Sequence, residues 1–181
     1  MLSQIRDGAP IYYDGVKVSG NLDLSGLDKV NSSLTIINSS IPNSNFAGVT
    51  FDKEVIFWGT AFGDTSFSEA VFNQPVVFDG TEFLSSVNFE NAEFKKDTLF
   101  NSVRFLGNAY FNYTHFSDYS YFSGAKFFGN ASFSDIKFDG PSDFTAANFT
   151  RGARFIRSEF DSPIFSNAFF GGLAQFGTTS V

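Results

Sequence analysis

Phenylalanine recurs at a fixed interval through the middle of the chain. Between residues 78 and 160 two interleaved sets of phenylalanines each repeat every eleven residues, so successive rings are separated alternately by five and six residues. The first set is Phe78, Phe89, Phe100, Phe111, Phe122, Phe133, Phe144 and Phe155, and the second is Phe83, Phe94, Phe105, Phe116, Phe127, Phe138, Phe149 and Phe160. A solvated loop or an ordinary globular domain would not keep this count, so the repeat is the strongest constraint on the fold.

The count extends beyond this stretch in both directions. Toward the N-terminus it continues in steps of five or six through Phe46, with aliphatic residues such as Val30 and Ile36 at the earliest positions, and toward the C-terminus it reaches Phe176. We therefore expect one repeat array over residues 16–176, with a short N-terminal cap at 1–15 and a tail at 177–181. A cap is expected because the open end of a repeat array exposes its core.

Each repeat has the alternation of a short strand. A small or β-branched residue lies two positions before the central ring, and a variable, often polar residue separates them, as in Ala92-Glu93-Phe94. Alternate side chains of a strand point to opposite faces, so the small residue and the ring point inward. Gly, Asn, Asp and Ser are frequent in the following residues, which predicts turns. Stacked strands about 4.8 Å apart would bury the rings in one internal column, which is a β-solenoid.

The repeats resemble those of the pentapeptide-repeat proteins, whose motif is a small residue, a polar residue, a central Leu or Phe and two more outward residues. The motif appears as AVFNQ at 70–74, AEFKK at 92–96, AKFFG at 125–129 and ANFTR at 147–151. The resemblance covers roughly residues 16–176 and implies an all-β, right-handed, four-sided β-helix. This chain differs in that every second repeat has six residues. We therefore expect two eleven-residue units in each coil, or about 22 residues per coil, with the extra residue of each unit in a corner.

Composition excludes several classes of function. The net charge is −7 and cysteine is absent; the first argues against direct binding of nucleic acid, and the second excludes disulfides, thiolate catalysis and cysteine-ligated metals. There is no apolar run long enough for a transmembrane helix, and the N-terminus lacks the pattern of a signal peptide. We therefore expect a cytoplasmic protein, which could have a basic partner.

No arrangement of residues in the sequence indicates catalysis. The only histidine, His115, occupies an outward position, where a solvated side chain is expected. No nucleophile elbow or phosphate-binding loop is present, and the carboxylates are scattered rather than clustered as metal ligands. The sequence predicts a protein that is not an enzyme, with no cofactor and no metal.

The resemblance also implies an alternative function, because some pentapeptide-repeat proteins bind DNA gyrase as acidic mimics of duplex DNA. Such a mimic of DNA for gyrase or another topoisomerase needs a continuous negative face. Outward positions two eleven-residue units apart instead give mixed signs, in the columns Glu82, Arg104, Lys126, Asn148 and Glu93, His115, Lys137, Glu159. Alternation of this kind is typical of cross-strand pairing on a solvated surface.

Two outward columns are apolar. One lies just before the central rings and contains Ile56, Val77, Leu99 and Tyr121; the other lies just after them and contains Leu84, Leu106 and Phe128. Exposed apolar strips indicate a contact surface, although apolar residues could also be present only for their β-propensity. We predict a structural or protein-protein interaction module that uses one of these strips.

The C-terminal end of the array leads to a related expectation. Only five residues follow Phe176, and they form no amphipathic segment that could cover the last coil. Uncovered coil ends expose apolar surface and unpaired strand edges. We therefore expect either self-association through the C-terminal coil end or that the chain is a fragment of a longer protein.

Overall fold

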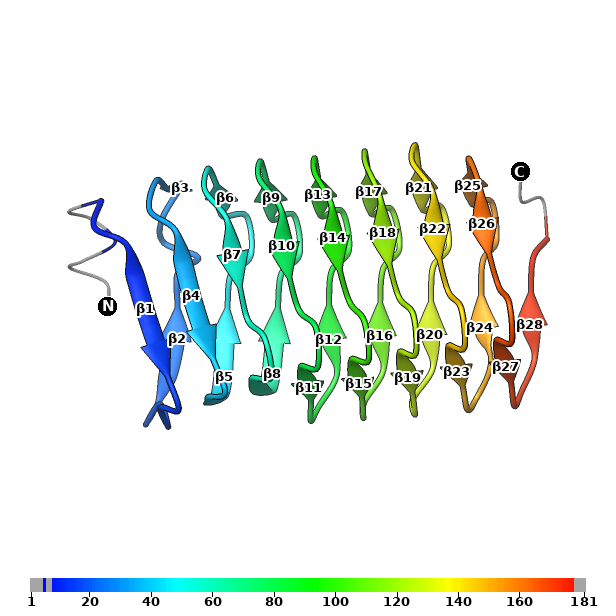
Figure 1. Cartoon of the computed structure of the whole chain (residues 1–181), viewed down its shortest axis with the longest axis horizontal. Helices are drawn as coiled ribbons and strands as arrows, with labels where there is room; N and C mark the ends of the chain where they lie inside the picture. Colours follow the sequence, from blue (N-terminus) through cyan, green and yellow to red (C-terminus); the bar gives the residue numbers. More distant parts are fainter. Residues whose placement is uncertain (1–4, 6–7, 178–181) are drawn as a thin grey trace.

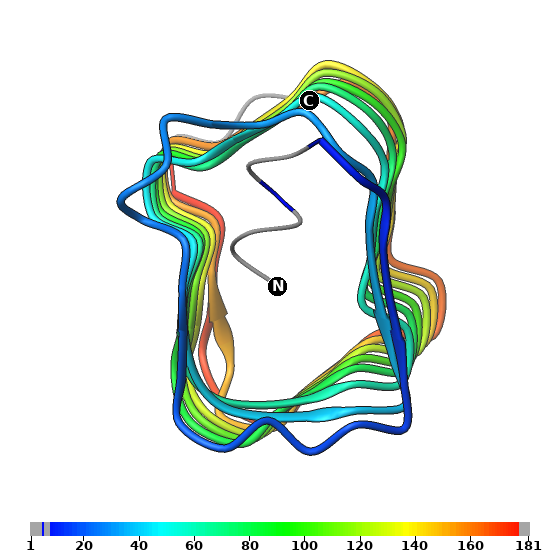
Figure 2. The ribbon, with the colours of Figure 1, turned by 90° about the vertical axis from the view of Figure 1, so that its left-hand side faces the viewer.

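The computed structural model describes residue 5 and residues 8–177, which form a long parallel β-solenoid (Figure 1). Its cross-section has four sides (Figure 2). Viewed from the N-terminal end, the chain runs clockwise as it recedes, so the coil is right-handed (Figure 2). The predicted fold class is thus confirmed. None of the helices in the described part of the chain is long and apolar enough to cross a membrane.

Twenty-eight short strands in the described part of the chain, all pairing in parallel, line the four sides of the coil. The first side contains β1 (Ile11–Asp14), β4 (Leu34–Ile37), β7 (Val55–Ile56), β10 (Val76–Val77), β14 (Thr98–Leu99), β18 (Ser120–Tyr121), β22 (Ser142–Asp143) and β26 (Pro163–Ile164). The fourth side contains β3 (Lys29–Val30), β6 (Thr50–Phe51), β9 (Val71–Phe72), β13 (Glu93–Phe94), β17 (His115–Phe116), β21 (Lys137–Phe138) and β25 (Glu159–Phe160).

The second and third sides belong to one 13-stranded sheet, because β5 (Ser40–Asn45) and β8 (Ala61–Ser66) run along both of them. The second side continues with β11 (Glu82–Phe83), β15 (Arg104–Phe105), β19 (Lys126–Phe127), β23 (Asn148–Phe149) and β27 (Phe169–Phe170). The third side contains β2 (Asn21–Asp23), β12 (Val87–Asn88), β16 (Ala109–Tyr110), β20 (Ala131–Ser132), β24 (Ala153–Arg154) and β28 (Ala174–Gln175).

The length of a coil changes along the solenoid. In the middle, equivalent positions such as Glu90 and Asn112 are 22 residues apart, as the eleven-residue unit predicts. Toward the N-terminus the spacing falls to 21 residues, as between Ser44 and Thr65. Toward the C-terminus the spacing is again 21 residues, as between the paired residues Ser142 and Pro163. The longer central coils are therefore flanked by coils that have one residue fewer.

The additional residue of the longer coils lies at a corner, as predicted. In one of the shorter coils, β8 runs without interruption from the second side to the third. In the next coil, residues 84–86 form a bend that separates β11 from β12. The longer connection ends the continuous strand at this corner while the register of the strands above and below is kept.

Five-residue repeats turn at tight corners. In one of them the amide of Thr81 donates to the carbonyl of Phe78, 2.9 Å away, and the third residue of the turn, Gly80, has φ of 66°. A type II turn needs positive φ at this position, which glycine adopts without a steric cost. Ser102 and Ala146 occupy the same corner in other coils with φ of 57° and 55°. Their side chains make this conformation less favourable.

The core consists of four ladders of phenylalanine rings, one for each side. Rings of successive coils stack nearly parallel, as Phe100 and Phe122 do with centroids 4.8 Å apart, whereas rings of the opposite first and third sides meet edge to face, as Phe100 and Phe111 do at 90°. The stacking distance matches the spacing between strands. All but two of the 27 phenylalanines belong to these ladders; the exceptions, Phe128 and Phe169, are outward. The predicted internal column is confirmed.

The N-terminal end of this core is covered by apolar side chains. Ile5 is buried against the core, and β1 contributes the buried Ile11 while it pairs with β4. Of the predicted cap at 1–15, residues 1–4, 6 and 7 lie outside the described part, as do residues 178–181 of the predicted tail.

Candidate interaction surfaces

The first apolar column is a continuous ladder on the first side of the solenoid. Strand pairing places Ile56 beside Val77, Val77 beside Leu99, and Leu99 beside Tyr121. Each of these residues lies between two buried residues, so its own side chain points outward and is half-buried. We call Ile56, Val77, Leu99 and Tyr121 the first apolar ladder. It covers four successive coils and ends where Tyr121 pairs with Asp143.

Two exposed aromatic residues that the sequence pattern did not single out flank strands of this side. Trp58 is 50% exposed and lies two residues after Ile56, directly after the central ring Phe57. Tyr119 is exposed as well, and its ring stacks on Tyr121 with centroids 5.9 Å apart. The position of Trp58, directly after a central ring, was a signal for outward orientation. Tyr119 lies in a corner, where the repeat pattern gives no direction for the side chain.

Carboxylates surround the end of the ladder at Tyr121. Partial burial raises the pKa of the Tyr121 hydroxyl, and the negative charges of Asp97, Asp118 and Asp143 raise this pKa further because they oppose a phenolate. The apolar surface is therefore bordered by negative charge. Such a border favours a partner whose apolar side chains are accompanied by lysine or arginine.

The second apolar column, Leu84, Leu106 and Phe128, follows the central rings of the second side. The amides of Leu106 and Phe128 donate to carbonyls of the preceding coil, which keeps the three residues in line. All three side chains are exposed, but the guanidinium of Arg104 lies 5.7 Å from the centre of the Phe128 ring. A cation over the ring covers part of its apolar face. This column is shorter than the first apolar ladder.

The C-terminal coil exposes several large apolar side chains. Leu173 is 70% exposed and Phe169 57% exposed, and Phe176 is also exposed although its ring stacks on Phe155. Phe165 is only partly buried, whereas rings of the central coils are fully buried. We call the surface formed by Phe169, Leu173 and Phe176 the C-terminal coil end.

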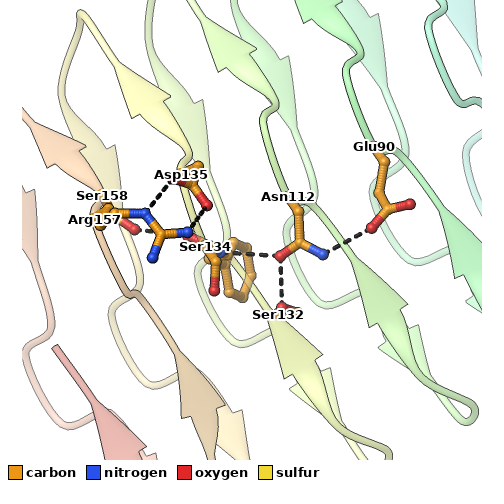
Figure 3. Close-up of polar contacts among 8 residues, drawn as sticks. Glu90, Asn112, Ser132, Ser134, Asp135, Arg157 and Ser158 are labelled. Atoms are coloured by element: carbon orange, nitrogen blue, oxygen red, sulfur yellow. Dashed lines mark hydrogen bonds and ion pairs between the residues drawn. The ribbon is translucent and has the colours of Figure 1, made fainter. Parts of the chain in front are cut away.

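Several polar residues elsewhere on the surface are paired between coils. At the corner from the third to the fourth side, the side-chain nitrogen of Asn112 donates to Glu90, 2.7 Å away, and Nε and Nη2 of Arg157 each donate to one carboxylate oxygen of Asp135 at 2.6 Å (Figure 3). The hydrogen bonds from Arg157 lower the pKa of Asp135. These ladders hold neighbouring coils together through partners within the chain.

The charged columns have mixed signs in the structure also. Glu82 lies beside Arg104, and Nη1 of Arg104 is 2.5 Å from Oε1 of Glu82. On the fourth side, Nε2 of His115 lies 2.6 Å from Oδ2 of Asp139, and Nζ of Lys137 lies 2.8 Å from Oδ1. The hydrogen bonds from Lys137 and His115 lower the pKa of Asp139. No continuous acidic face is present on these two columns.

His115 is on the outer surface, as predicted. Its contact with Asp139 is between two partly exposed side chains and does not form an enclosed site. Among the described residues, no group of three His, Asp, Glu or Cys side chains is arranged to hold a metal ion. The first and second sides of the solenoid therefore offer apolar strips, and paired charges lie beside them.

A family model matches the central coils, and several solved structures are similar to the chain. Residues 57–103 and 94–137 match a family model described as pentapeptide repeats in nine copies. Among solved structures, a trypsin-treated variant of QnrB1, described as a plasmid-mediated fluoroquinolone resistance protein, is 16% identical with a TM-score of 0.42, and the match covers 94% of this chain and 72% of that one. HetL, a pentapeptide-repeat protein from the cyanobacterium Nostoc sp. described as involved in the regulation of heterocyst differentiation, is 13% identical with a TM-score of 0.25 and coverage of 98% and 94%.

None of the curated proteins has a matching sequence. The family match is contiguous over the central coils and includes Val77, Leu99 and Tyr121 of the first apolar ladder. Residues 57–137 of this chain thus match the pentapeptide-repeat family.

Proposed function

We propose that this chain is a non-enzymatic protein-interaction module that binds a protein partner through the first apolar ladder. The observation that carries the proposal is the register of Ile56, Val77, Leu99 and Tyr121, which aligns four outward apolar side chains on one side of the solenoid. None of these residues is needed to fill the core, because the inward neighbours of each are already buried. A continuous apolar surface of this kind is typical of a contact site.

The partner is expected to be a basic, partly apolar protein surface. Asp97, Asp118 and Asp143 all act on Tyr121 at one end of the ladder, and the chain as a whole has a net charge of −7. Complementary charges around an apolar contact increase the rate of association and exclude partners of the wrong sign. Binding should therefore weaken as the salt concentration rises.

The test uses the double variant Leu99→Ser, Tyr121→Ser, with Leu106→Ser as a matched control on the second side. Proteins captured from the source cell by the unaltered chain should be lost with the double variant and retained with the control. Captured partners should then bind directly in a purified system, at least tenfold more weakly to the double variant. Equal binding by all three chains would refute the use of this ladder.

We further propose that two copies of the chain associate through the C-terminal coil end. The support is the exposure of Phe169, Leu173 and Phe176 beside core rings that are only partly buried. Stacking a second coil end on this surface would bury apolar side chains and pair strand edges. Sedimentation velocity should show a dimer for the unaltered chain and a monomer for Phe169→Ser, Leu173→Ser. A monomer at all concentrations for the unaltered chain would refute self-association, without bearing on the apolar ladder.

The alternative function, an acidic mimic of DNA that binds gyrase or another topoisomerase, has less support. The acidic composition, with a net charge of −7, is compatible with such a role. The pairing of Glu82 with Arg104, and of Asp139 with His115 and Lys137, argues against it because these pairs interrupt the negative surface. A gyrase supercoiling assay with the chain in excess separates the two: inhibition would favour the mimic, and unchanged supercoiling would favour the interaction module.

A further inference from the structure

Two arginines, one on the third side of the solenoid and one in the corner before it, have no partner in the described part of the chain. Arg151 and Arg154 are exposed, and neither forms an ion pair or a side-chain hydrogen bond there. The other two arginines of residues 8–177 behave differently. Arg104 and Arg157 each bind a carboxylate that lies one coil earlier in the same ladder, Glu82 and Asp135 respectively.

The neighbours of the two unpaired arginines explain the difference. Strand pairing places Arg154 between Ser132 and Gln175, so the side chains above and below it are uncharged. Arg151 lies in a corner whose equivalent residue in the preceding coil is Gly129, which has no side chain. In a chain with a net charge of −7, these two guanidinium groups are a local positive site.

A groove of about 410 Å³ lies between these arginines and is lined by neutral polar side chains. Asn108, Tyr110, Asn130 and Gln175 contribute to its walls, and no carboxylate does. Gly152 also lines the groove and takes the place that follows Asn108 and Asn130 in their column. Gly152 has φ of 96°, and a Cβ atom there would lie 2.3 Å from the carbonyl oxygen of Leu173.

The hydrogen-bonding groups of the groove are mainly donors. The two guanidinium groups provide fixed donors that match the oxygens of a phosphate group. The side chains of Asn130 and Gln175 form no hydrogen bond within the described part of the chain, and the Tyr110 hydroxyl accepts from Asn108, which leaves its own hydrogen free to donate. A volume of this size accommodates a ligand larger than a single anion.

We propose that this groove binds a small phosphorylated ligand, with the phosphate group on Arg151 and Arg154 and neutral hydroxyl groups on Asn130, Gln175 and Tyr110. The same chemistry could come from free phosphate or from a phosphate ester of a sugar-sized molecule. The volume and the neutral polar walls favour the ester. The site is on a different side of the solenoid from the first apolar ladder, so it does not depend on the proposed protein partner.

The experiment is a titration followed by the NMR signals of the arginine Nε groups, with inorganic phosphate, glucose 6-phosphate and glucose as probes. We expect saturable shifts at Arg151 and Arg154, with those of Arg104 and Arg157 remaining in place as internal controls. The phosphate ester should bind more tightly than inorganic phosphate, and glucose alone should not bind. Equal shifts at all four arginines, or no saturation with either phosphate, would overturn the proposal; equal affinity for the two phosphates would overturn the hydroxyl contacts.

Variants provide the second measurement. Arg151→Gln and Arg154→Gln should each weaken binding of glucose 6-phosphate by about tenfold, the effect of losing one charge-assisted contact. Arg104→Gln is the matched control, because it removes a similarly exposed guanidinium on the second side and should leave the affinity unchanged. All three substitutions are at the surface, so their thermal unfolding should stay close to that of the unaltered chain. Unchanged affinity in Arg154→Gln would contradict the proposed site.

Discussion

Removing a buried hydroxyl from the core of the first side should make the protein more stable. Ser142 points inward and has no measurable exposure, and its Oγ has no hydrogen-bond partner among the described residues. A buried polar group without a partner costs about 1–3 kcal/mol. Ser142→Ala removes that group and keeps the Cβ atom in place, while losing a few packing contacts of the oxygen. The expected net gain is about 1 kcal/mol.

The gain can be measured as a shift of thermal unfolding. For a chain of this length, about 1 kcal/mol corresponds to an increase in Tm of about 2–4 °C, and the urea midpoint should rise in parallel without a change in the m-value. Circular dichroism follows both transitions. The expected increase is small but well above the reproducibility of the method.

Ser158→Ala is the matched control, because it removes the same group from an equally buried site. The Ser158 hydroxyl donates to the carbonyl of Phe133 at 2.6 Å (Figure 3). Its loss should reduce stability by about 1 kcal/mol. The two substitutions should therefore have opposite signs. A decrease in stability for Ser142→Ala, of the size found for Ser158→Ala, would refute the argument, because it would mean that the Ser142 hydroxyl is satisfied in solution.

Three further predictions concern corners, core and charge. Gly129→Ala should lower stability in urea unfolding by about 1–3 kcal/mol, because the added Cβ would lie 2.3 Å from the backbone of the preceding coil. Gly26→Ala is the control: it has open space around it and should change stability by less than about 0.5 kcal/mol. Phe111→Ala in the fully buried ladder should cost about 3–5 kcal/mol, and Phe176→Ala at the exposed end less than half of that; similar losses at both sites would contradict the ladder as the source of stability. The pKa of Asp135 is lowered in the folded state. Its contribution to folding stability is therefore present above the unfolded pKa of about 3.9 and is lost as the pH falls through the lower folded pKa. Asp135→Asn should make stability fall less steeply with pH in the acid range, and an unchanged curve would show that the ion pair contributes nothing.

The inward half of the fold could be predicted because it is periodic. A residue that recurs every eleven positions and alternates with polar neighbours can be buried only if the repeats stack. The four-sided coil implied by the resemblance to pentapeptide-repeat proteins then assigns Phe100 and Phe122 to one ladder. The backbone conformation of the corners was harder to predict. Their locations follow from the count, but the continuous strand β8 and the bend at 84–86 differ by a single residue, and the sequence pattern does not say which connection remains extended.

The candidate sites divide in the same way. The first apolar ladder could be anticipated since its members recur with the period of a coil, and strand pairing now places Leu99 beside Val77 and Tyr121. The arginine groove could not be anticipated from a periodic pattern. It is lined by two arginines, Arg151 and Arg154, that recur in no column.

In this solenoid, stability and recognition are assigned to different residues of the same strand. In β14, Thr98 points inward and is fully buried, Leu99 points outward, and the following Phe100 fills the core. Leu99→Ser should therefore cost only the cross-strand contacts of one outward side chain, about 0.2–1 kcal/mol, whereas Phe100→Ala should cost about 3–5 kcal/mol. If the ladder serves recognition, Leu99→Ser should reduce partner binding by far more than its small effect on unfolding predicts. If instead the two effects are proportional, these outward apolar residues are present for the sheet itself, and the partner must bind elsewhere.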